Sequence, residues 1–354
     1  MMEFTRKVSD VLACSFSSWY PLFEKVTTKS VWVPVPAEVA AYIRSGGTVV
    51  SSEATTADTN TDDEEDSVDW EAAEEGADEL QRPEFAPFDA ELRSAVAAVG
   101  GAAFVKLNWS APADVRWLSV GRALRCQSPE DVHLLLRSSG RLQRDLCTPF
   151  EGCADAGAAS ADLHLVVRRW EDINPAAEFR CFVIEGHLIA ISQREISQYF
   201  PHLERDSSSI ITDITSFFKE KIQAKFPLQN YVFDVYRSTK DHVRLVDFSP
   251  LAPPTDPALF TWDQLTGKHC LRCESAPSPG SPLCLGCASA GGALPVFQYI
   301  AGADSIQRAP YADAELPYDV HHLAESGGTA AILQLLQKSQ NLGKSDQSTD
   351  DEDG

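Results

Sequence analysis

A predicted β-hairpin at residues 231–250 constrains the fold of this chain more than any other stretch. Apolar and polar residues alternate on both sides of a polar turn, which is the pattern of two paired strands. With two residues in the turn, Asp234 lies directly opposite Asp247, and Ser249 shares their face. Opposed like charges destabilise a sheet, so a cation between these side chains would stabilise it, and oxygen ligands suit Mg²⁺. In the alternative interpretation, both acids face solvent.

The negative charge of the chain is concentrated in two segments. The chain has 354 residues and a net charge of −22, but residues 51–80 carry thirteen acids and no Lys or Arg, and residues 341–354 carry five acids and one Lys. The remainder is therefore only mildly acidic and offers no basic surface for nucleic acid. Low hydrophobicity and a run of one charge sign predict a disordered acidic linker at 51–80 and a disordered acidic tail at 338–354.

Other features of the sequence favour a globular protein of the cytoplasm. Hydrophobic residues make up 44 % of the chain, which is enough for a large core. No run of about 18 apolar residues predicts a membrane span, and the charged first ten residues do not form a signal peptide. Nine cysteines, with four close together, fit a reducing compartment better than a disulfide scaffold. We therefore expect no direct contact with nucleic acid or membrane.

Periodicity predicts a mixture of helices and strands. Apolar residues recur at helical spacing, or alternate at strand spacing, between breaks rich in Gly, Pro and Ser. The predicted helices span residues 36–44, 89–99, 129–136, 210–226 and 328–337. The predicted strands outside the hairpin span 30–35, 102–107, 163–169, 179–184, 187–193 and 296–300. An apolar cluster near the N-terminus either forms core or binds a partner: Phe16, Trp19, Tyr20, Leu22 and Phe23.

Side chains, rather than a glycine-rich loop, must neutralise any bound nucleotide. The motifs GxxxxGK[ST], GxGxxG, HExxH and GxSxG are absent. Cations in strand-like segments are the candidates, because Arg donates two parallel hydrogen bonds to phosphate oxygens. These cations are Lys106, Arg168, Arg180 and Arg194. Trp109 could pack against a flat base, and the strand end at Trp170 could offer backbone donors and acceptors to an adenine edge. The alternatives are surface ion pairs for the cations and ordinary core packing for the tryptophans.

Several strings of residues, many containing Trp, resemble a known family. They are SFSSWYPLF, VKLNWSAPADVRW, VVRRWEDINPAAEFRCFV, LIAISQRE, YVFDVYR, LVDFSP and LFTWDQL. In this order and with these gaps, they resemble the cell division cycle protein 123 (D123-type) family over residues 10–265 and, more weakly, over 295–319. The resemblance implies an α+β, ATP-grasp-like fold in which two lobes with antiparallel sheets clamp a nucleotide.

The resemblance also implies a binding site for ATP and Mg²⁺. With Arg194 added from its strand-like segment, the cofactor-binding residues are Lys106, Trp109, Ala111, Asp114, Arg168, Trp170, Arg180, Arg194, Asp234, Asp247 and Ser249. The last three would hold Mg²⁺, and Lys106 and Arg180 would contact phosphates. Two departures weaken the metal part: Ser249 stands where the family has Asn, and the Gly-Glu that follows in the family is replaced by residues 251–254.

As a function, the resemblance implies an ATP- and Mg²⁺-binding assembly factor, or chaperone, for eukaryotic translation initiation factor 2. Such a factor binds the gamma subunit, promotes its joining to the alpha subunit, and supports translation initiation and cell-cycle progression. It need not be an enzyme. Two alternatives are open: an ATP-grasp ligase or kinase that transfers phosphate to an unknown acceptor, and a zinc-containing adaptor that has lost ATP.

A second predicted site has the pattern Cys270-x2-Cys273-x10-Cys284-x2-Cys287. Two CxxC pairs supply four thiolates, the ligand set of a tetrahedral zinc site. Prolines and a glycine in the short gap help the chain to turn back. The alternative is an inserted loop with free thiols.

These segments predict the organisation of the whole chain. In order, it contains an N-terminal core or partner-binding segment (1–50), the acidic linker (51–80), the N-terminal lobe (81–150), the C-terminal lobe with the metal hairpin (151–265), the Cys-rich insertion (266–292), a C-terminal part of the fold (293–337) and the acidic tail (338–354).

Overall fold

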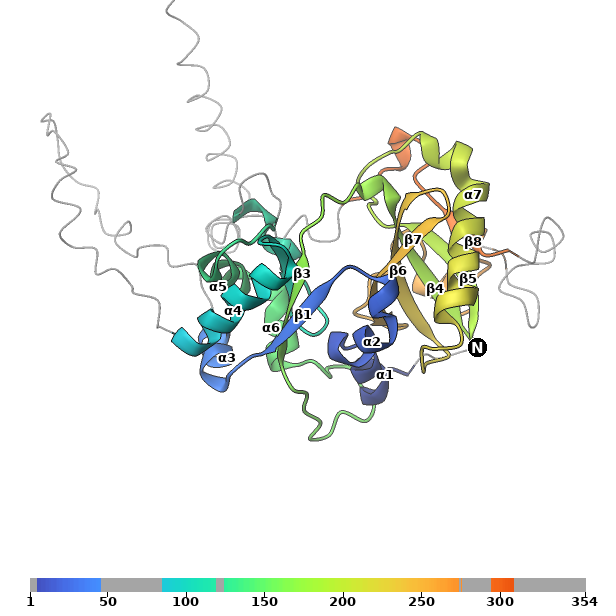
Figure 1. Ribbon diagram of the computed structural model, residues 1–354. Helices are drawn as coiled ribbons and strands as arrows, with labels where there is room; N and C mark the ends of the chain where they lie inside the picture. Colours follow the sequence, from blue (N-terminus) through green and yellow to red (C-terminus); the bar gives the residue numbers. More distant parts are fainter. Residues whose placement is uncertain (1–4, 46–84, 119–123, 274, 276–293, 309–354) are drawn as a thin grey trace, which may run out of the picture.

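The computed structural model describes residues 5–45, 85–118, 124–273, 275 and 294–308. These residues form two lobes, each built on its own β-sheet (Figure 1). Helices and mainly antiparallel strands are mixed along the chain, so the fold is α+β, as predicted. In this part of the chain, no helix is long and apolar enough to cross a bilayer.

The smaller lobe has a three-stranded antiparallel sheet in the order β1-β3-β2. Its strands are β1 (Ser30–Pro34), β2 (Ala103–Lys106) and β3 (His164–Arg169). Its helices are α3 (Ala37–Arg44), α4 (Ala86–Val99), α5 (Pro129–Ser138) and α6 (Gly140–Cys147). Apolar residues of all four helices share one core with Val105, Leu165 and Val167 of the sheet. The edge strand β2 therefore holds Lys106 at the end of a well-packed element.

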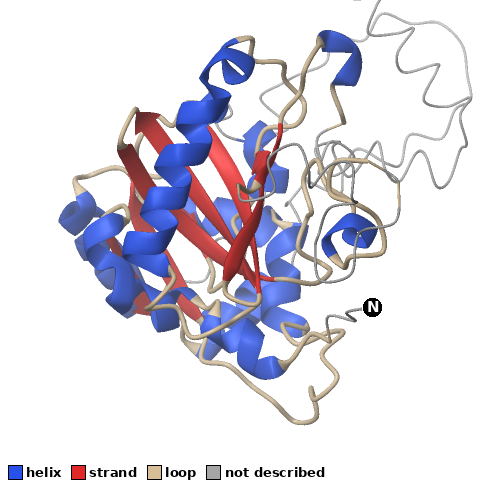
Figure 2. Ribbon diagram, turned by 90° about the vertical axis from the view of Figure 1, so that its right-hand side faces the viewer, coloured by secondary structure: helices blue, strands red, loops and turns tan. Residues whose placement is uncertain are grey.

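The larger lobe has a five-stranded sheet in the order β7-β6-β4-β5-β8. Its strands are β4 (Glu178–Ile184), β5 (His187–Gln193), β6 (Tyr231–Thr239), β7 (His242–Pro250) and β8 (Val296–Gln298). β8 runs parallel to β5, and the other neighbours are antiparallel. α7 (His202–Phe217) crosses one face of this sheet and continues as a π-helical turn, Phe218–Ile222 (Figure 2).

Alternation along the strands gives the larger sheet two different faces. Phe179, Cys181 and Phe233 belong to the core beneath α7. Their neighbours Arg180 and Asp234 lie on the opposite face, because side chains of a strand alternate. Beyond these polar residues, the second face is covered by apolar residues from the segment that contains α8 (Trp262–Leu265). The short 3₁₀ elements are Glu24–Val26, Ala113–Leu118, Pro175–Ala177 and Ala303–Ser305.

The N-terminal helices α1 (Val8–Ala13) and α2 (Phe16–Phe23) pack on the larger lobe before the chain crosses to the smaller sheet (Figure 1). The side chains of Phe16, Trp19, Tyr20 and Phe23 are at most 4 % exposed. Trp19 packs edge-on against Phe248 of β7, with ring centroids 5.6 Å apart. The core interpretation is therefore confirmed for four of the five residues in the predicted cluster, while Leu22 is 51 % exposed.

The hairpin of β6 and β7 has the predicted pairs at its turn and at the two acids, but the pairs between them are shifted by one residue. Thr239 pairs with His242, and Asp234 pairs with Asp247. A β-bulge beside this acidic pair adds one residue, Val246, to β7. The side chains of the two acids are only 16 % and 20 % exposed, so the interpretation in which both face solvent is wrong.

The structure differs from the prediction in several places, and three of them bear on the site. The sequence predicts that the C-terminal lobe begins at 151, but β3 is the central strand of the smaller sheet, where it pairs with both β1 and β2. α6 is not predicted, because Gly140 resembles a helix stop, whereas Ser139 caps a new helix by accepting a hydrogen bond from the Leu142 backbone. α7 begins at His202 instead of 210. The predicted linker, the helix at 328–337 and the tail lie outside the described residues.

Candidate functional site

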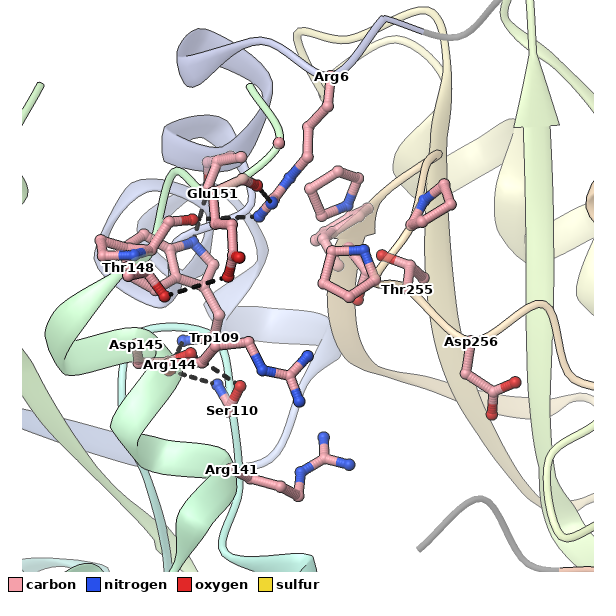
Figure 3. A pocket seen from close by; sticks show the side chains of 18 of the residues that line it. Arg6, Trp109, Ser110, Arg141, Arg144, Asp145, Thr148, Glu151, Thr255 and Asp256 are labelled. Atoms are coloured by element: carbon pink, nitrogen blue, oxygen red, sulfur yellow. Dashed lines mark hydrogen bonds between the residues drawn. The ribbon is translucent and has the colours of Figure 1, made fainter. Parts of the chain in front are cut away.

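Two cavities lie where the lobes meet. The first, which we call the arginine cavity, has a volume of about 480 Å³ and lies between α6 and the end of the hairpin (Figure 3). The second, which we call the hinge cavity, has a volume of about 390 Å³ and is lined by the chain after β3. Val246 lines the hinge cavity, whereas Phe248 and Ser249 line the arginine cavity. Asp247 therefore lies at the boundary between the two.

Asp234 binds two arginines on the polar face of the larger sheet. The register of β4 and β6 places Arg180 opposite Asp234. Arg180 donates two hydrogen bonds to this carboxylate, of 2.8 and 2.7 Å, and a third, of 2.6 Å, to the Asp256 carbonyl. Arg194 lies 3.7 Å from Asp234 and 3.5 Å from the Asp256 carboxylate. The cations of the chain itself thus relieve the repulsion between Asp234 and Asp247.

Burial and neighbouring charges shift the pKa values of Asp234 and Arg180 in opposite directions. Burial alone would raise the pKa of Asp234, but Arg180 and Arg194 outweigh it and hold the pKa below its ordinary value. Burial also opposes the charged form of Arg180, yet Asp234 and Asp256 raise the pKa of this guanidinium overall. The charge of Arg180 lowers the pKa of Arg194, and burial adds to the effect. Asp234 is therefore a stable anion, and the two arginines repel one another.

Lys106 forms a direct connection between the lobes. It ends β2 of the smaller sheet, is 2 % exposed, and forms an ion pair and hydrogen bond with Asp247 of β7. The other carboxylate oxygen of Asp247 accepts a hydrogen bond of 3.1 Å from the Phe248 backbone. A phosphate or cation that enters here must exchange with this ion pair.

Arg168 has hydrogen-bond donors that the described residues do not satisfy. It lies in β3, is 8 % exposed, and its Nε and Nη2 atoms have no partner among the described residues. The guanidinium lies 5.6 Å from the centre of the Phe16 ring, and burial lowers its pKa despite the charge of Asp247. Because Arg168 also lines the hinge cavity, an anionic ligand could accept the unused hydrogen bonds.

The two candidate tryptophans lie at different cavities. Trp170 lines the hinge cavity, and its backbone donates to the Ala102 carbonyl at 2.9 Å. Trp109 lines the arginine cavity; its Nε1 atom donates to the Val11 carbonyl at 2.8 Å, and its ring packs edge-on against Phe150. Trp109 is thus anchored by the N-terminal helices, whereas Trp170 borders the space expected for a base.

Two candidate residues lie outside both cavity linings, as Lys106, Asp234 and Asp247 also do, so their role at a nucleotide stays a prediction. Asp114 is 5 % exposed and accepts hydrogen bonds from the Ser139 hydroxyl, at 2.6 Å, and from the Arg141 backbone, at 3.0 Å. It therefore stabilises the start of α6. Neither Asp114 nor Ala111 lines either of the two cavities. The cause is local, because the chain after Ala111 turns into a 3₁₀ helix.

Three arginines of the arginine cavity are missing from the prediction: Arg6, Arg141 and Arg144. The latter two are three residues apart on α6 and so lie on one face of the helix. The signal for this helix was Ser139 as a cap followed by a polar, Arg-rich stretch. No sequence signal connects Arg6 to this site, because its position depends on contacts with residues 149 and 151.

The residues fit a nucleotide better than they fit Mg²⁺. Cations from both lobes and the unused donors of Arg168 suit phosphate oxygens. Both oxygens of Asp234, however, are engaged by Arg180, and those of Asp247 by Lys106 and the Phe248 backbone, so a cation would have to displace or share these contacts. Of the three predicted ligands, Ser249 lines the arginine cavity. Within the described residues, no group of three His, Cys, Asp or Glu side chains could hold a metal.

The cysteine site extends beyond the described residues. Cys270 is buried and Cys273 is half-buried, and both contribute to the core near α8. Cys284 and Cys287 lie outside the described residues. The zinc site therefore stays a prediction.

Comparison with known proteins places the chain in a family. The sequence model of the D123 family matches residues 19–324, which is most of the chain. The chain belongs to the D123 family. A Xenopus tropicalis protein called translation initiation factor eIF2 assembly protein is 35 % identical over 342 residues, covering 95 % of this chain and 98 % of that protein. Cell division cycle protein 123 of Aspergillus terreus is 38 % identical over 267 residues, covering 72 % of this chain and 62 % of that protein.

Solved structures confirm the two-lobed fold of this D123-family chain. Cdc123 from Schizosaccharomyces pombe is 32 % identical and superposes with a TM-score of 0.61, covering 74 % of this chain and 93 % of that one. A C-terminally truncated form of the same protein gives 29 % identity and a TM-score of 0.63, with 84 % and 99 % covered. The predicted resemblance and the predicted fold class are therefore confirmed.

Proposed function

We propose that this chain is an assembly factor for eukaryotic translation initiation factor 2 and acts in the cytoplasm. The proposal is supported by relatives that carry this name and match over nearly their whole length, such as those of Xenopus tropicalis and Danio rerio. The chain would bind the gamma subunit and promote its joining to the alpha subunit. In this way it would support translation initiation and progression of the cell cycle.

The cleft between the lobes would hold ATP. The observation that carries this part is the buried guanidinium of Arg168, whose Nε and Nη2 atoms have no partner among the described residues. The base would enter the hinge cavity beside Trp170, and the phosphates would lie toward Arg180 and Arg194 of the arginine cavity and toward Lys106, which pairs with Asp247 between the two cavities. Bound ATP would supply the negative charge that joins cations of the two lobes.

Mg²⁺ would be held chiefly by Asp247 and Ser249. Asp247 would have to exchange its ion pair with Lys106 for the metal, while Lys106 turns to a phosphate. Asp234 would contribute by holding Arg180, and it could reach the cation only by releasing that arginine. Because Ser has a shorter side chain than Asn, a water could connect its hydroxyl to the metal.

Co-purification with the gamma subunit tests both parts of the proposal. Wild-type protein should retain the gamma subunit in the presence of Mg²⁺-ATP and retain less of it after the nucleotide is removed. Asp247→Ala should lower retention, and Asp206→Ala is the matched control, because the ion pair of Asp206 within the described residues is with the exposed Arg205. Failure to retain the gamma subunit under any condition would contradict the assembly role. Steady formation of ADP with a candidate acceptor would instead indicate a ligase or kinase.

A further inference from the structure

The N-terminal segment contacts both lobes of the molecule. Its helices α1 and α2 are anchored in the core of the larger lobe, where Trp19 and Phe23 pack against the ring of Phe248, with centroids 5.6 and 5.2 Å apart. Burial of large aromatic side chains is among the most stabilising contacts in a protein. The segment is therefore a fixed part of the larger lobe, and its contacts with the smaller lobe are contacts between lobes.

Arg6, which precedes α1, binds the loop that follows α6. This loop connects α6 to β3 and so belongs to the smaller lobe. The Arg6 guanidinium donates hydrogen bonds to the carbonyls of Pro149, at 3.1 Å, and Glu151. The Arg6 carbonyl accepts a hydrogen bond of 3.0 Å from the Ala154 backbone. Figure 3 shows the Arg6 side chain extending from the N-terminal segment toward Glu151, at one end of the arginine cavity.

A fourth hydrogen bond joins the start of α1 to the same loop. The backbone of Val8, the first residue of α1, donates to the Asp155 carboxylate at 2.9 Å. Lys7, the residue before the helix, makes no side-chain cap, so Asp155 supplies an acceptor for the helix start from the smaller lobe. Asp155 is absent from the described linings of both cavities, so a substitution there alters these contacts without altering a cavity wall. We call the four hydrogen bonds the N-terminal latch.

The N-terminal latch and the covalent connections between the lobes lie at opposite ends of the cleft. The described chain crosses between the lobes before β1 and again after β3. Thr28 of the first crossing and Trp170 of the second both line the hinge cavity. Arg6 and Glu151 of the latch line the arginine cavity instead, and Asp247 lies at the boundary between the two cavities. A rotation of the lobes about the two crossings would therefore open the cleft at the latch.

The N-terminal latch is weaker than the anchor on the larger lobe. Trp19 and Phe23 of the anchor are at most 1 % exposed, whereas the latch bonds from Arg6 to Glu151 and from Val8 to Asp155 are exposed to solvent. Exposed hydrogen bonds exchange with water at little net cost, and segments with few apolar contacts open first. We propose that the N-terminal latch opens and closes one end of the cleft and so controls how fast a ligand enters and leaves. The ligand is the nucleotide of the proposed function, on which this controlling role rests, whereas the opening of the latch does not depend on it.

Hydrogen exchange followed by mass spectrometry measures the opening of the latch in the full chain without a ligand. The backbone amides of Val8 and Ala154 are donors in the latch, so the peptides that contain them should exchange faster than the peptide of α2. Asp155→Ala should speed exchange in both latch peptides about three- to tenfold, as expected for one lost hydrogen bond. Acceleration at Ala154, whose own bond stays intact, would show that the bonds open together. Asp155→Asn keeps an acceptor oxygen and should resemble the wild type, and Asp206→Ala, on α7, is the matched control.

Stopped-flow mixing with a fluorescent ATP analogue measures whether the latch controls entry to the cleft. Asp155→Ala should raise the rate constants of association and dissociation by similar factors, so the dissociation constant should change less than either rate constant. Faster dissociation with unchanged association would mean that Asp155 only stabilises the bound form, and this result would overturn the proposal.

Two further outcomes would also contradict the N-terminal latch. One is exchange of the Val8 and Ala154 amides as slow as that of α2 in the wild type. The other is an unchanged pair of rate constants in Asp155→Ala although its latch peptides exchange faster. If the wild type does not bind the ATP analogue at all, the nucleotide part of the proposed function fails and the control of entry fails with it, whereas hydrogen exchange still shows whether the latch opens.

Discussion

The carboxylate of Asp234 holds the arginine cluster together, and its loss should be costly. Asp234→Asn leaves Arg180 buried without its anionic partner. Breaking such a buried pair should lower the free energy of unfolding by roughly 3–5 kcal/mol. Urea denaturation at neutral pH measures this change. Asp206→Asn removes an acid from an exposed pair with Arg205 and should have almost no effect.

Asp234→Asn should also change how the stability of the protein depends on pH. The pKa of Asp234 is lower in the folded protein than in the unfolded chain, mainly because two arginines outweigh the effect of burial. Its contribution to stability is therefore complete above its ordinary pKa and is lost as the pH falls through the folded value. Acidification should thus destabilise the wild type more than Asp234→Asn. Parallel stability curves for the two proteins between about pH 5 and pH 2 would contradict the assignment.

Ser249 provides a test of the proposed Mg²⁺ site. If the Ser249 side chain is too short to reach the metal, Ser249→Asn supplies a carbonyl oxygen as the third ligand and should tighten binding of Mg²⁺-ATP. Titration calorimetry with and without Mg²⁺ measures the effect, and affinity for metal-free ATP should not change. An equal affinity for Mg²⁺-ATP in both proteins would mean that the serine hydroxyl, or a water that it holds, already serves the metal.

The contacts of single residues show which features could be predicted from the sequence and which could not. Counting from the turn places Asp234 opposite Asp247, and this pair forms because two register shifts, which the sequence does not predict, cancel along the hairpin. The partners of these acids could not be predicted in the same way. Lys106 reaches Asp247 from another lobe, and Arg180 reaches Asp234 across a strand pair whose register depends on the packing of the whole sheet.

Among the elements, the helix ends can be tested most directly. Gly100 ends α4 with φ +113°, in the left-handed region. Gly100→Ala should destabilise the protein by about 1–2 kcal/mol, for backbone reasons alone, because an added Cβ would meet nothing within 4 Å. Thermal denaturation measures the loss. Gly140→Ala is the matched control: this glycine starts α6 without a positive φ, and alanine there should be neutral or slightly stabilising.

Helices and strands with a regular spacing of apolar residues could be predicted, whereas elements that depend on tertiary contacts could not. The hairpins of β4–β5 and β6–β7 and the helices α3, α4 and α5 follow from alternation, caps and breaks. β3 could not be assigned to a lobe, because strand order in the chain does not give strand order in the sheet. α6 was missed at a Ser-Gly junction, and with it the arginine pair of the cavity.

The Cys-rich segment gives a prediction about metal content. If the two CxxC pairs bind zinc, purified protein should contain zinc in equal amount to the chain, and Cys273→Ser should lose it. Elemental analysis after dialysis measures the content. Cys147→Ser is the control, since this cysteine is exposed on α6, in the other lobe. Metal-free wild-type protein with four titratable thiols in this segment would favour the inserted loop.

At the scale of the whole molecule, few charged groups connect the two lobes directly. Lys106 on the smaller sheet pairs with Asp247 on the larger one, and Arg194 faces Arg141 across the arginine cavity. The first contact holds the lobes together, whereas the second brings like charges to the same cavity, although Arg194 also pairs with Asp234 and Asp256. An anion between the lobes would attract cations of both. The resting clamp should therefore be less stable than the same clamp with a bound nucleotide.

ATP should raise the stability of the whole chain through this clamp. At a hundredfold excess over its dissociation constant, a ligand that binds only the folded state adds about 2.7 kcal/mol, and thermal denaturation with increasing ATP measures it. Lys106→Met should lower the unfolding midpoint without ATP, because Asp247 loses its partner, and should reduce the gain from ATP, because the phosphates lose a cation. Lys221→Met, at an exposed pair with Glu220, should keep the full gain. An equal gain from ATP in Lys106→Met would show that the nucleotide does not use the contact between the lobes.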